Sequence, residues 1–206
     1  MTHLAALTPM PPFGYNPAMD TAAQLHGMRI AILTDDAFEQ VEMTQPRKAL
    51  DEAGATTVLI SAHTPAVQGW NHHDKGDSFQ VDLALDQASP IDFDAVLLPG
   101  GALNADVLRG IQPAVSFVRG MAEAGKPIAA ICHAPWILIE AGVARGRKLT
   151  SWPSLQTDLR NAGATWVDET VVDDNNLVTS RKPDDIPAFN KHMIGLFSKA
   201  RDKAHA

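Results

Sequence analysis

The sequence predicts an α/β protein with a doubly wound, flavodoxin-like fold, in which a mostly parallel central sheet lies between two layers of helices. Continuous apolar runs are typical of strands buried on both faces of a parallel sheet, and four occur, at residues 28–34, 56–62, 93–98 and 126–131. Segments with helical spacing separate or follow them, at 41–54, 106–125, 133–142, 154–163 and 184–203. Residues 65–70 and 78–85 predict a small hairpin, and residues 165–180 predict a strand and a second hairpin around Asn175.

The chain divides into an arm, one domain and a short tail. Residues 1–27 hold four of the fourteen prolines and show no sustained period, which predicts an extended arm. The 206-residue chain is 45% hydrophobic, enough to close one sizeable core. We therefore expect a single domain over residues 28–200 and a tail over 201–206.

Charge and composition exclude several classes of function. A net charge of −7 leaves no broad cationic surface for a phosphate backbone, so we expect no stable nucleic-acid binding. No apolar run approaches the roughly 20 residues needed to cross a bilayer, and the amino terminus has no secretory pattern. A single cysteine agrees with a reducing compartment, so the expected location is the cytoplasm.

Two strand ends carry unusual residues: Gly100 and Gly101 follow one strand, and Cys132 and His133 follow another. Ligands bind at the carboxyl ends of strands in such sheets. A nucleophile on a sharp strand-to-helix turn needs small neighbours, which Ala130 and Ala134 provide. The start of the next helix would favour the thiolate, so the pattern predicts an acidic, reactive sulfur. A buried structural cysteine is the alternative.

Residues 130–164, "AICHAPWILIEAGVARGRKLTSWPSLQTDLRNAGA", resemble the signature of the PfpI (ThiJ/PfpI) family, within the class I glutamine amidotransferase-like superfamily. The resemblance continues through "DDAFEQVEMTQPRKALDEAGA", "FDAVLLPGG" and "LVTSRKPDDIPAFN", and covers about residues 28–197. Ala134 departs from the glycine usual in the family but keeps a small side chain. The downstream His-x-Glu element of true glutamine amidotransferases is absent, which disfavours glutamine hydrolysis.

The resemblance implies a catalytic set of Cys132 as nucleophile, His133 as adjacent base and Glu39 as a protonated carboxyl beside the sulfur. Glu42 is the competing carboxylate, with the simpler role of a residue at a helix start. Asp106 is the candidate for an acid supplied by a neighbouring subunit, and a helix cap is its alternative. The backbone N–H groups of Gly101 and His133 would hold an oxyanion, although the two glycines would also suit a plain tight turn.

Other polar residues suggest weaker possibilities. His72, His73 and Asp74, with His63 nearby, offer metal-ligand atoms, but no cysteine or second spaced pair completes a shell, so we predict no metal and no other cofactor. Trp136 and Trp152 are expected in the core, at an interface or at the pocket mouth. Arg181 could hold a substrate carboxylate, but an ion pair with Asp184 or Asp185 is the expectation.

The resemblance implies a cofactor-independent cysteine hydrolase that acts on small reactive aldehydes or glycated substrates, as glyoxalase III-like or deglycase enzymes do. The expected assembly is a homodimer or a larger homo-oligomer. Two alternatives stay open: a cysteine peptidase of the C56 type, and a redox-sensing stress protein or chaperone whose thiol is oxidised.

Overall fold

The computed structural model describes residues 24–204. Most of the predicted arm, residues 1–23, lies outside the described residues. Residues 24–27 form a turn that packs on the domain: Leu25 is fully buried, and its amide donates to the carbonyl of Ala53 at 2.9 Å. The folded unit therefore includes a few residues before the predicted start at residue 28.

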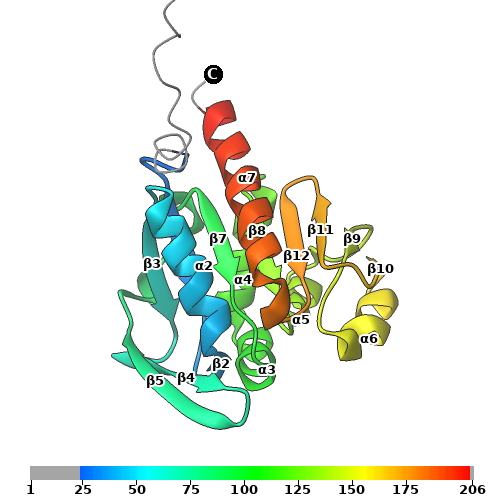
Figure 1. The fold of residues 1–206 in the computed structure, drawn as a ribbon, viewed down its shortest axis with the longest axis horizontal. Coiled ribbons are helices and arrows are strands. Elements are labelled where there is room, and N and C mark those ends of the chain that lie inside the picture. The colour runs from blue at the N-terminus through cyan, green and yellow to red at the C-terminus, as the bar shows by residue number, and fades with distance from the viewer. Residues whose placement is uncertain (1–23, 205–206) are drawn as a thin grey trace, which may run out of the picture.

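A seven-stranded sheet forms the centre of the molecule, in the order β11-β12-β8-β7-β1-β3-β6 (Figure 1). All neighbouring strands pair in parallel except β11, which is antiparallel to β12. This arrangement confirms the predicted fold class. The strands are β1 (Arg29–Leu33), β3 (Thr56–Ser61), β6 (Leu83–Ala84), β7 (Ala95–Leu98), β8 (Ile128–Ile131), β11 (Val171–Asp174) and β12 (Leu177–Ser180).

Helices cover both faces of this sheet. On one face lie α2 (Gln40–Glu52) and α7 (Ile186–Ala204), which bury Met43, Leu50 and Phe189 in one half of the core (Figure 1). The other face is covered by α3 (Ala102–Gly110), α4 (Gln112–Glu123) and α5 (Pro135–Glu140), with α6 (Gln156–Asn161) beside them. Helix α7 continues past the predicted boundary at residue 200. No described helix is long and apolar enough to span a membrane.

Smaller elements complete the fold. The predicted hairpin is present as β4 (Ala66–Asn71) and β5 (Asp74–Gln80), and β4 also pairs with the short β2 (Phe38–Glu39). Strands β9 (Lys148–Leu149) and β10 (Thr165–Trp166) pair separately. Single 3₁₀ turns occur at Leu85–Gln87, Pro90–Asp92, Pro153–Leu155 and Pro183–Asp185.

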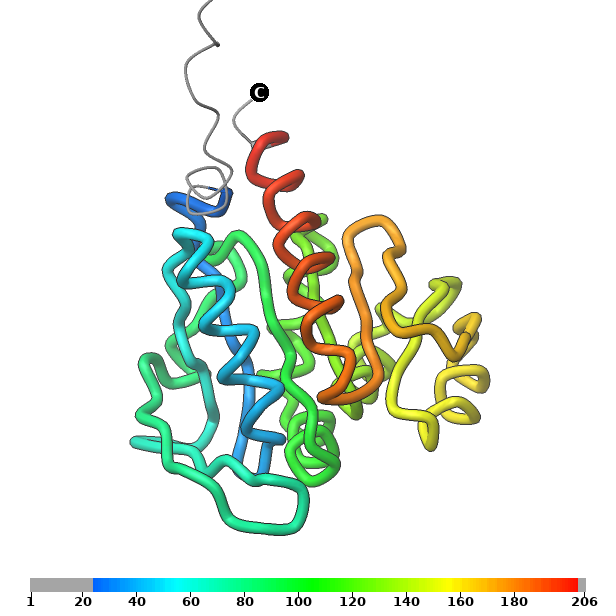
Figure 2. The backbone as a smooth tube through the Cα atoms, viewed as in Figure 1, coloured from blue at the N-terminus to red at the C-terminus, as the bar shows by residue number. Residues whose placement is uncertain are grey.

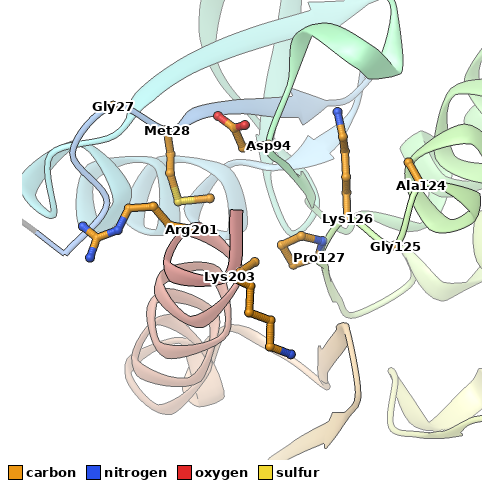
Figure 3. Close-up of a pocket in the computed structure, with 10 residues that line it drawn as sticks. Gly27, Met28, Asp94, Ala124, Gly125, Lys126, Pro127, Arg201 and Lys203 are labelled. Carbon is orange, nitrogen blue, oxygen red and sulfur yellow. The ribbon is translucent and has the colours of Figure 1, made fainter. Parts of the chain in front are cut away.

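The parallel strands bring the carboxyl ends of β1, β7, β8 and β12 to one edge of the sheet (Figure 2). The glycines after β7 and the cysteine after β8 therefore meet at this edge. A cavity of about 490 Å³ lies at the opposite edge, where Met28, Asp94 and Pro127 precede β1, β7 and β8 (Figure 3). That cavity contains neither Cys132 nor His133, and two of its charged groups are already bonded: Asp94 accepts from the amide of Arg29, and Lys126 donates to backbone carbonyls.

Candidate functional site

Cys132 occupies a constrained turn directly after β8. Its φ is 63°, in the left-handed region that residues with a Cβ rarely adopt. The Cys132 amide donates to the carbonyl of Ser180 at 3.1 Å, and its carbonyl accepts from the amide of Trp152 at 2.8 Å. Two separate segments thus hold a backbone conformation that costs about 1–3 kcal/mol, and such conformations cluster at functional sites. Ala134 has a φ of −53°, so the turn does not need glycine there.

His133 lies beside the thiol, and two tryptophans fix its ring. Its Nδ1 is 3.1 Å from the Sγ of Cys132. The indole of Trp152 stacks on the imidazole at a centroid distance of 5.6 Å and 23°, and Trp136 lies tilted against it at 5.4 Å. Burial lowers the pKa of His133 to about 4, so the imidazole is neutral at pH 7 and able to accept a proton.

The carboxyl group beside the sulfur is Glu42, so the expectation for Glu39 was wrong. Glu39 ends β2, and its Oε2 accepts a hydrogen bond from the amide of His72 at 3.1 Å, in the β4–β5 turn. Glu42 lies three residues later, in the first turn of α2 on the face that packs against the sheet, and it is fully buried. It forms a hydrogen bond with Cys132, and its Oε2 accepts another from the amide of Gly100 at 3.1 Å.

Burial, and then the nearby charge of Glu39, raise the pKa of Glu42 to about 8. The carboxyl group is therefore mostly protonated at pH 7 and can donate its hydrogen to the sulfur. Its Oε1 is buried and has no partner among the described residues. A protonated carboxyl group beside the sulfur was predicted for Glu39, and the structure gives this property to Glu42.

The predicted acidity of Cys132 is not supported. The residue is only 6% exposed, and burial raises the pKa of its thiol, with a further rise from the charge of Glu42. Backbone N–H groups of Gly101 and His133 act in the opposite direction. The following helix, α5, begins only at Pro135 and has six residues, too short for the expected dipole effect to prevail. At neutral pH the thiol keeps its proton, and His133 is the group placed to receive it.

The two glycines after β7 are required by close packing. A Cβ on Gly100 would lie 2.3 Å from Glu42 Oε2 and 2.5 Å from the Cβ of Cys132. Gly101 has a φ of 94°, and a Cβ there would lie 2.7 Å from the carbonyl oxygen of Ala37. The absence of side chains lets the carboxyl and the thiol approach each other and turns the amide of Gly101 toward the sulfur.

Asp106 is exposed on α3, apart from this cluster. The helix begins at Ala102 with Gly101 at its N-cap, so the alternative of Asp106 as a cap is wrong. Within residues 24–204, its carboxylate makes no hydrogen bond to His133. Any catalytic contact would have to come from a second copy of the chain.

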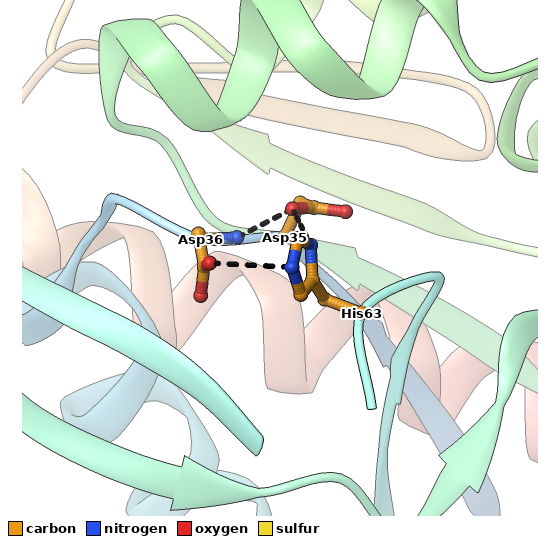
Figure 4. A group of neighbouring side chains, drawn as sticks. All are labelled: Asp35, Asp36 and His63. Atoms are coloured by element: carbon orange, nitrogen blue, oxygen red, sulfur yellow. Dashed lines mark hydrogen bonds and ion pairs between the residues drawn. The ribbon is translucent and has the colours of Figure 1, made fainter. Parts of the chain in front are cut away.

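The four residues considered as possible metal ligands do not lie together. His72 and His73 are exposed, and His63 lies instead with Asp35 and Asp36 (Figure 4). The ring of His63 spans the two carboxylates, with Nδ1 3.3 Å from Asp35 Oδ1 and Nε2 3.8 Å from Asp36 Oδ2. Because each nitrogen faces a different carboxylate, the group suits an ion-pair bridge. It stabilises the loop between β1 and β2.

A cavity of about 350 Å³ opens beside Trp152, next to the cysteine turn; Pro153, Asp168, Arg181 and Lys182 also line it. Arg181 pairs with Asp185, as one of the two expected pairings, and also with Asp168. Trp152 is 38% exposed and thus lies at the mouth, as one of the expectations had it. Its stacking on His133 was not predicted, because 19 residues separate them in the sequence.

Comparison with known proteins agrees with this architecture. The DJ-1/PfpI family profile matches residues 28–196. The chain is 44% identical to protein/nucleic acid deglycase 2 of Escherichia coli, over 82% of this chain and 96% of that protein. It is 42% identical to general stress protein 18 of Bacillus subtilis, over 84% and 99%. The structure of Drosophila melanogaster DJ-1beta matches with a TM-score of 0.73 at 28% identity, over 87% and 98%. The chain belongs to the DJ-1/PfpI family.

Proposed function

We propose that this protein is a cofactor-independent cysteine hydrolase that acts, in the cytoplasm, on reactive aldehydes and on the glycation adducts they form. The observation that carries the proposal is the contact of 3.1 Å between Cys132 and a neutral His133, beside the buried Glu42. The names of the relatives, deglycases among them, support the substrate class.

The first step is addition of the sulfur to the aldehyde carbon of methylglyoxal. The thiol proton passes to Nδ1 of His133, the S–C bond forms, and the carbonyl electron pair moves to oxygen. The amides of Gly101 and His133 stabilise that oxyanion, which then takes up the proton to give a hemithioacetal. With a glycated amine as substrate, the same S–C bond forms while the C–N bond breaks and the amine leaves with a proton.

The second step converts the hemithioacetal into products without any outside oxidant. The hydrogen on the former aldehyde carbon moves as a proton, through His133, to the neighbouring ketone carbon, and the carbon bonded to sulfur becomes a lactoyl thioester. Water then cleaves the S–C bond, and lactate leaves with regeneration of the thiol. The sum is methylglyoxal plus water to lactic acid, or adduct plus water to free amine and lactic acid.

The test is lactate release from methylglyoxal by purified protein and its Cys132→Ser variant. The proposal predicts turnover that the substitution abolishes, with the fold kept, as circular dichroism would report. His72→Ala, on the exposed turn, is the matched control and should retain activity. Turnover that survives in Cys132→Ser would overturn the proposal.

A redox-sensing stress role is the second candidate, favoured by the similarity to a general stress protein and by the protonated carboxyl beside the thiol. Titration with peroxide followed by intact mass measurement separates the two functions. Client binding gained only after oxidation, without turnover by the reduced protein, would favour the sensor. The peptidase alternative is weaker, because a thiol that is 6% exposed gives a peptide chain little access.

We also propose that the active form is at least a dimer joined through α3. Leu103 and Val107, one helical turn apart, are 63% and 46% exposed, and Asp106 lies between them on the sequence. Pairing of this face with another copy would bury the apolar side chains and bring Asp106 toward a partner's site. Mixing inactive Cys132→Ser with inactive Asp106→Asn subunits should restore part of the activity, whereas an active monomer at all concentrations would contradict the proposal.

A further inference from the structure

The cavity beside Trp152 is lined by residues that contact the candidate catalytic turn or follow its neighbours in sequence. Its aromatic wall, Trp152, donates its backbone amide to the carbonyl of Cys132 at 2.8 Å and stacks on His133. Arg181 and Lys182 are charged residues of its lining. Arg181 directly follows Ser180, and the carbonyl of Ser180 accepts a hydrogen bond from the amide of Cys132 at 3.1 Å. The cavity therefore lies next to the residue that stacks on the imidazole.

Arg181 has little capacity left for an anionic ligand. Its Nε and Nη2 donate to both oxygens of Asp185, at 2.8 and 3.1 Å, and its Nη1 donates to Asp168 at 2.7 Å. Nη2 also contacts the hydroxyl of Thr170 at 3.4 Å. A guanidinium with two carboxylates around it cannot offer the free fork that binds phosphate or carboxylate.

The remaining charges favour a cation. Lys182 pairs with Asp184 at 3.0 Å. Together with the pairs of Arg181, this gives a cluster of two cations and three carboxylates, Asp168, Asp184 and Asp185, with a net charge of −1. The side chain of Asp168 is 61% exposed and keeps an oxygen open to solvent. A partly exposed indole beside such a carboxylate is a combination that attracts guanidinium and ammonium groups.

We propose, resting on the deglycase function above, that this cavity binds the leaving-amine part of the substrate and selects cationic groups over phosphate-bearing ones. The preferred substrates are adducts of methylglyoxal with guanidines and alkylamines, as on arginine and lysine side chains. Adducts of nucleotides are poorer substrates, because their phosphates meet the exposed carboxylate of Asp168 and no free guanidinium.

The test compares kcat/KM for methylglyoxal adducts of Nα-acetyl-arginine amide, guanosine and guanosine monophosphate. Guanosine and its monophosphate differ only in the phosphate, so their ratio isolates the effect of charge. The arginine adduct is expected to be favoured over the monophosphate adduct. Asp168→Asn should reduce this preference roughly three- to fivefold, the range for a partly exposed charge interaction, and Asp168→Lys should reduce it further. Asp173→Asn, on β11 and outside the lining of the cavity, is the matched control.

Two outcomes separate this inference from the function on which it rests. If none of the adducts is turned over, the deglycase function fails. If all three are turned over with equal efficiency, or if the Asp168 variants leave the ratio unchanged, the function stands and the selective cavity is refuted. Binding of Nα-acetyl-arginine amide and of guanosine monophosphate to inactive Cys132→Ser, by calorimetry, gives the same comparison without turnover, and equal affinities would also refute it.

Discussion

Replacement of Glu42 by glutamine is expected to stabilise the protein at neutral pH, although it removes a hydrogen-bonded group from the site. The carboxyl has a pKa of 4.5 as a free side chain and about 8 in the folded protein. Between these values the unfolded chain has released its proton and the folded chain still holds it, so the free energy of unfolding falls as pH rises. Each pKa unit corresponds to about 1.4 kcal/mol, which gives a loss of roughly 3 kcal/mol by pH 7 and roughly 4 kcal/mol by pH 8, where the folded carboxyl is half ionised.

Glutamine carries no proton to lose, and its amide can donate to Cys132 while its oxygen accepts from Gly100. The free energy of unfolding should be measured by urea denaturation of both proteins at intervals from pH 4.5 to 8. The difference, Glu42→Gln minus wild type, should grow with pH toward the magnitude above. Glu52→Gln, on the exposed side of the same helix, is the matched control for the loss of a carboxylate from α2, and its difference should stay well below that magnitude. A constant difference for Glu42→Gln would refute the burial of a protonated carboxyl.

Three further predictions concern activity. Gly100→Ala places a Cβ 2.3 Å from Glu42 Oε2 and should lower kcat/KM by on the order of a hundredfold, as misplaced catalytic groups do, whereas Gly110→Ala, with open space around it, should not. The pH profile of kcat/KM should fall below about pH 4, where His133 takes up a proton, and above about pH 8, where Glu42 loses one; a profile without the alkaline limb would contradict the role of Glu42. Trp152→Ala should lower kcat about tenfold, which is part of the 10²–10⁴-fold that a well-placed general base contributes. Trp152→Phe should recover much of this loss, because a ring restores the stack on His133. An unchanged kcat in the alanine variant would show that the stack does not position the imidazole.

The fold was predictable because its strands and helices carry strong local patterns. The runs at 95–98 and 128–131 contain only apolar residues, as a parallel strand covered on both faces requires, and glycines mark the ends of several helices. Helix boundaries were less accurate where packing decides them. Helix α3 begins four residues earlier than predicted, since the positive φ of Gly101 lets the chain turn into a helix at once.

The site was predictable only as far as local sequence determines it. Cys132 and His133 are adjacent, so their proximity follows from the chain itself. The choice between Glu39 and Glu42 depends on where a two-residue strand ends and which face of α2 packs inward, and motif spacing does not contain that information. The prediction of an acidic thiol failed for a similar reason: the burial that raises the pKa of Cys132 depends on the whole fold.

Detection of a covalent intermediate tests the central claim most directly. Wild-type protein mixed with methylglyoxal, quenched with acid within the first turnovers and digested, should show one methylglyoxal equivalent on the peptide that contains Cys132. The adduct should disappear once substrate is exhausted and should be absent from Cys132→Ser. Turnover at the normal rate with that peptide unmodified at every time point would contradict the account.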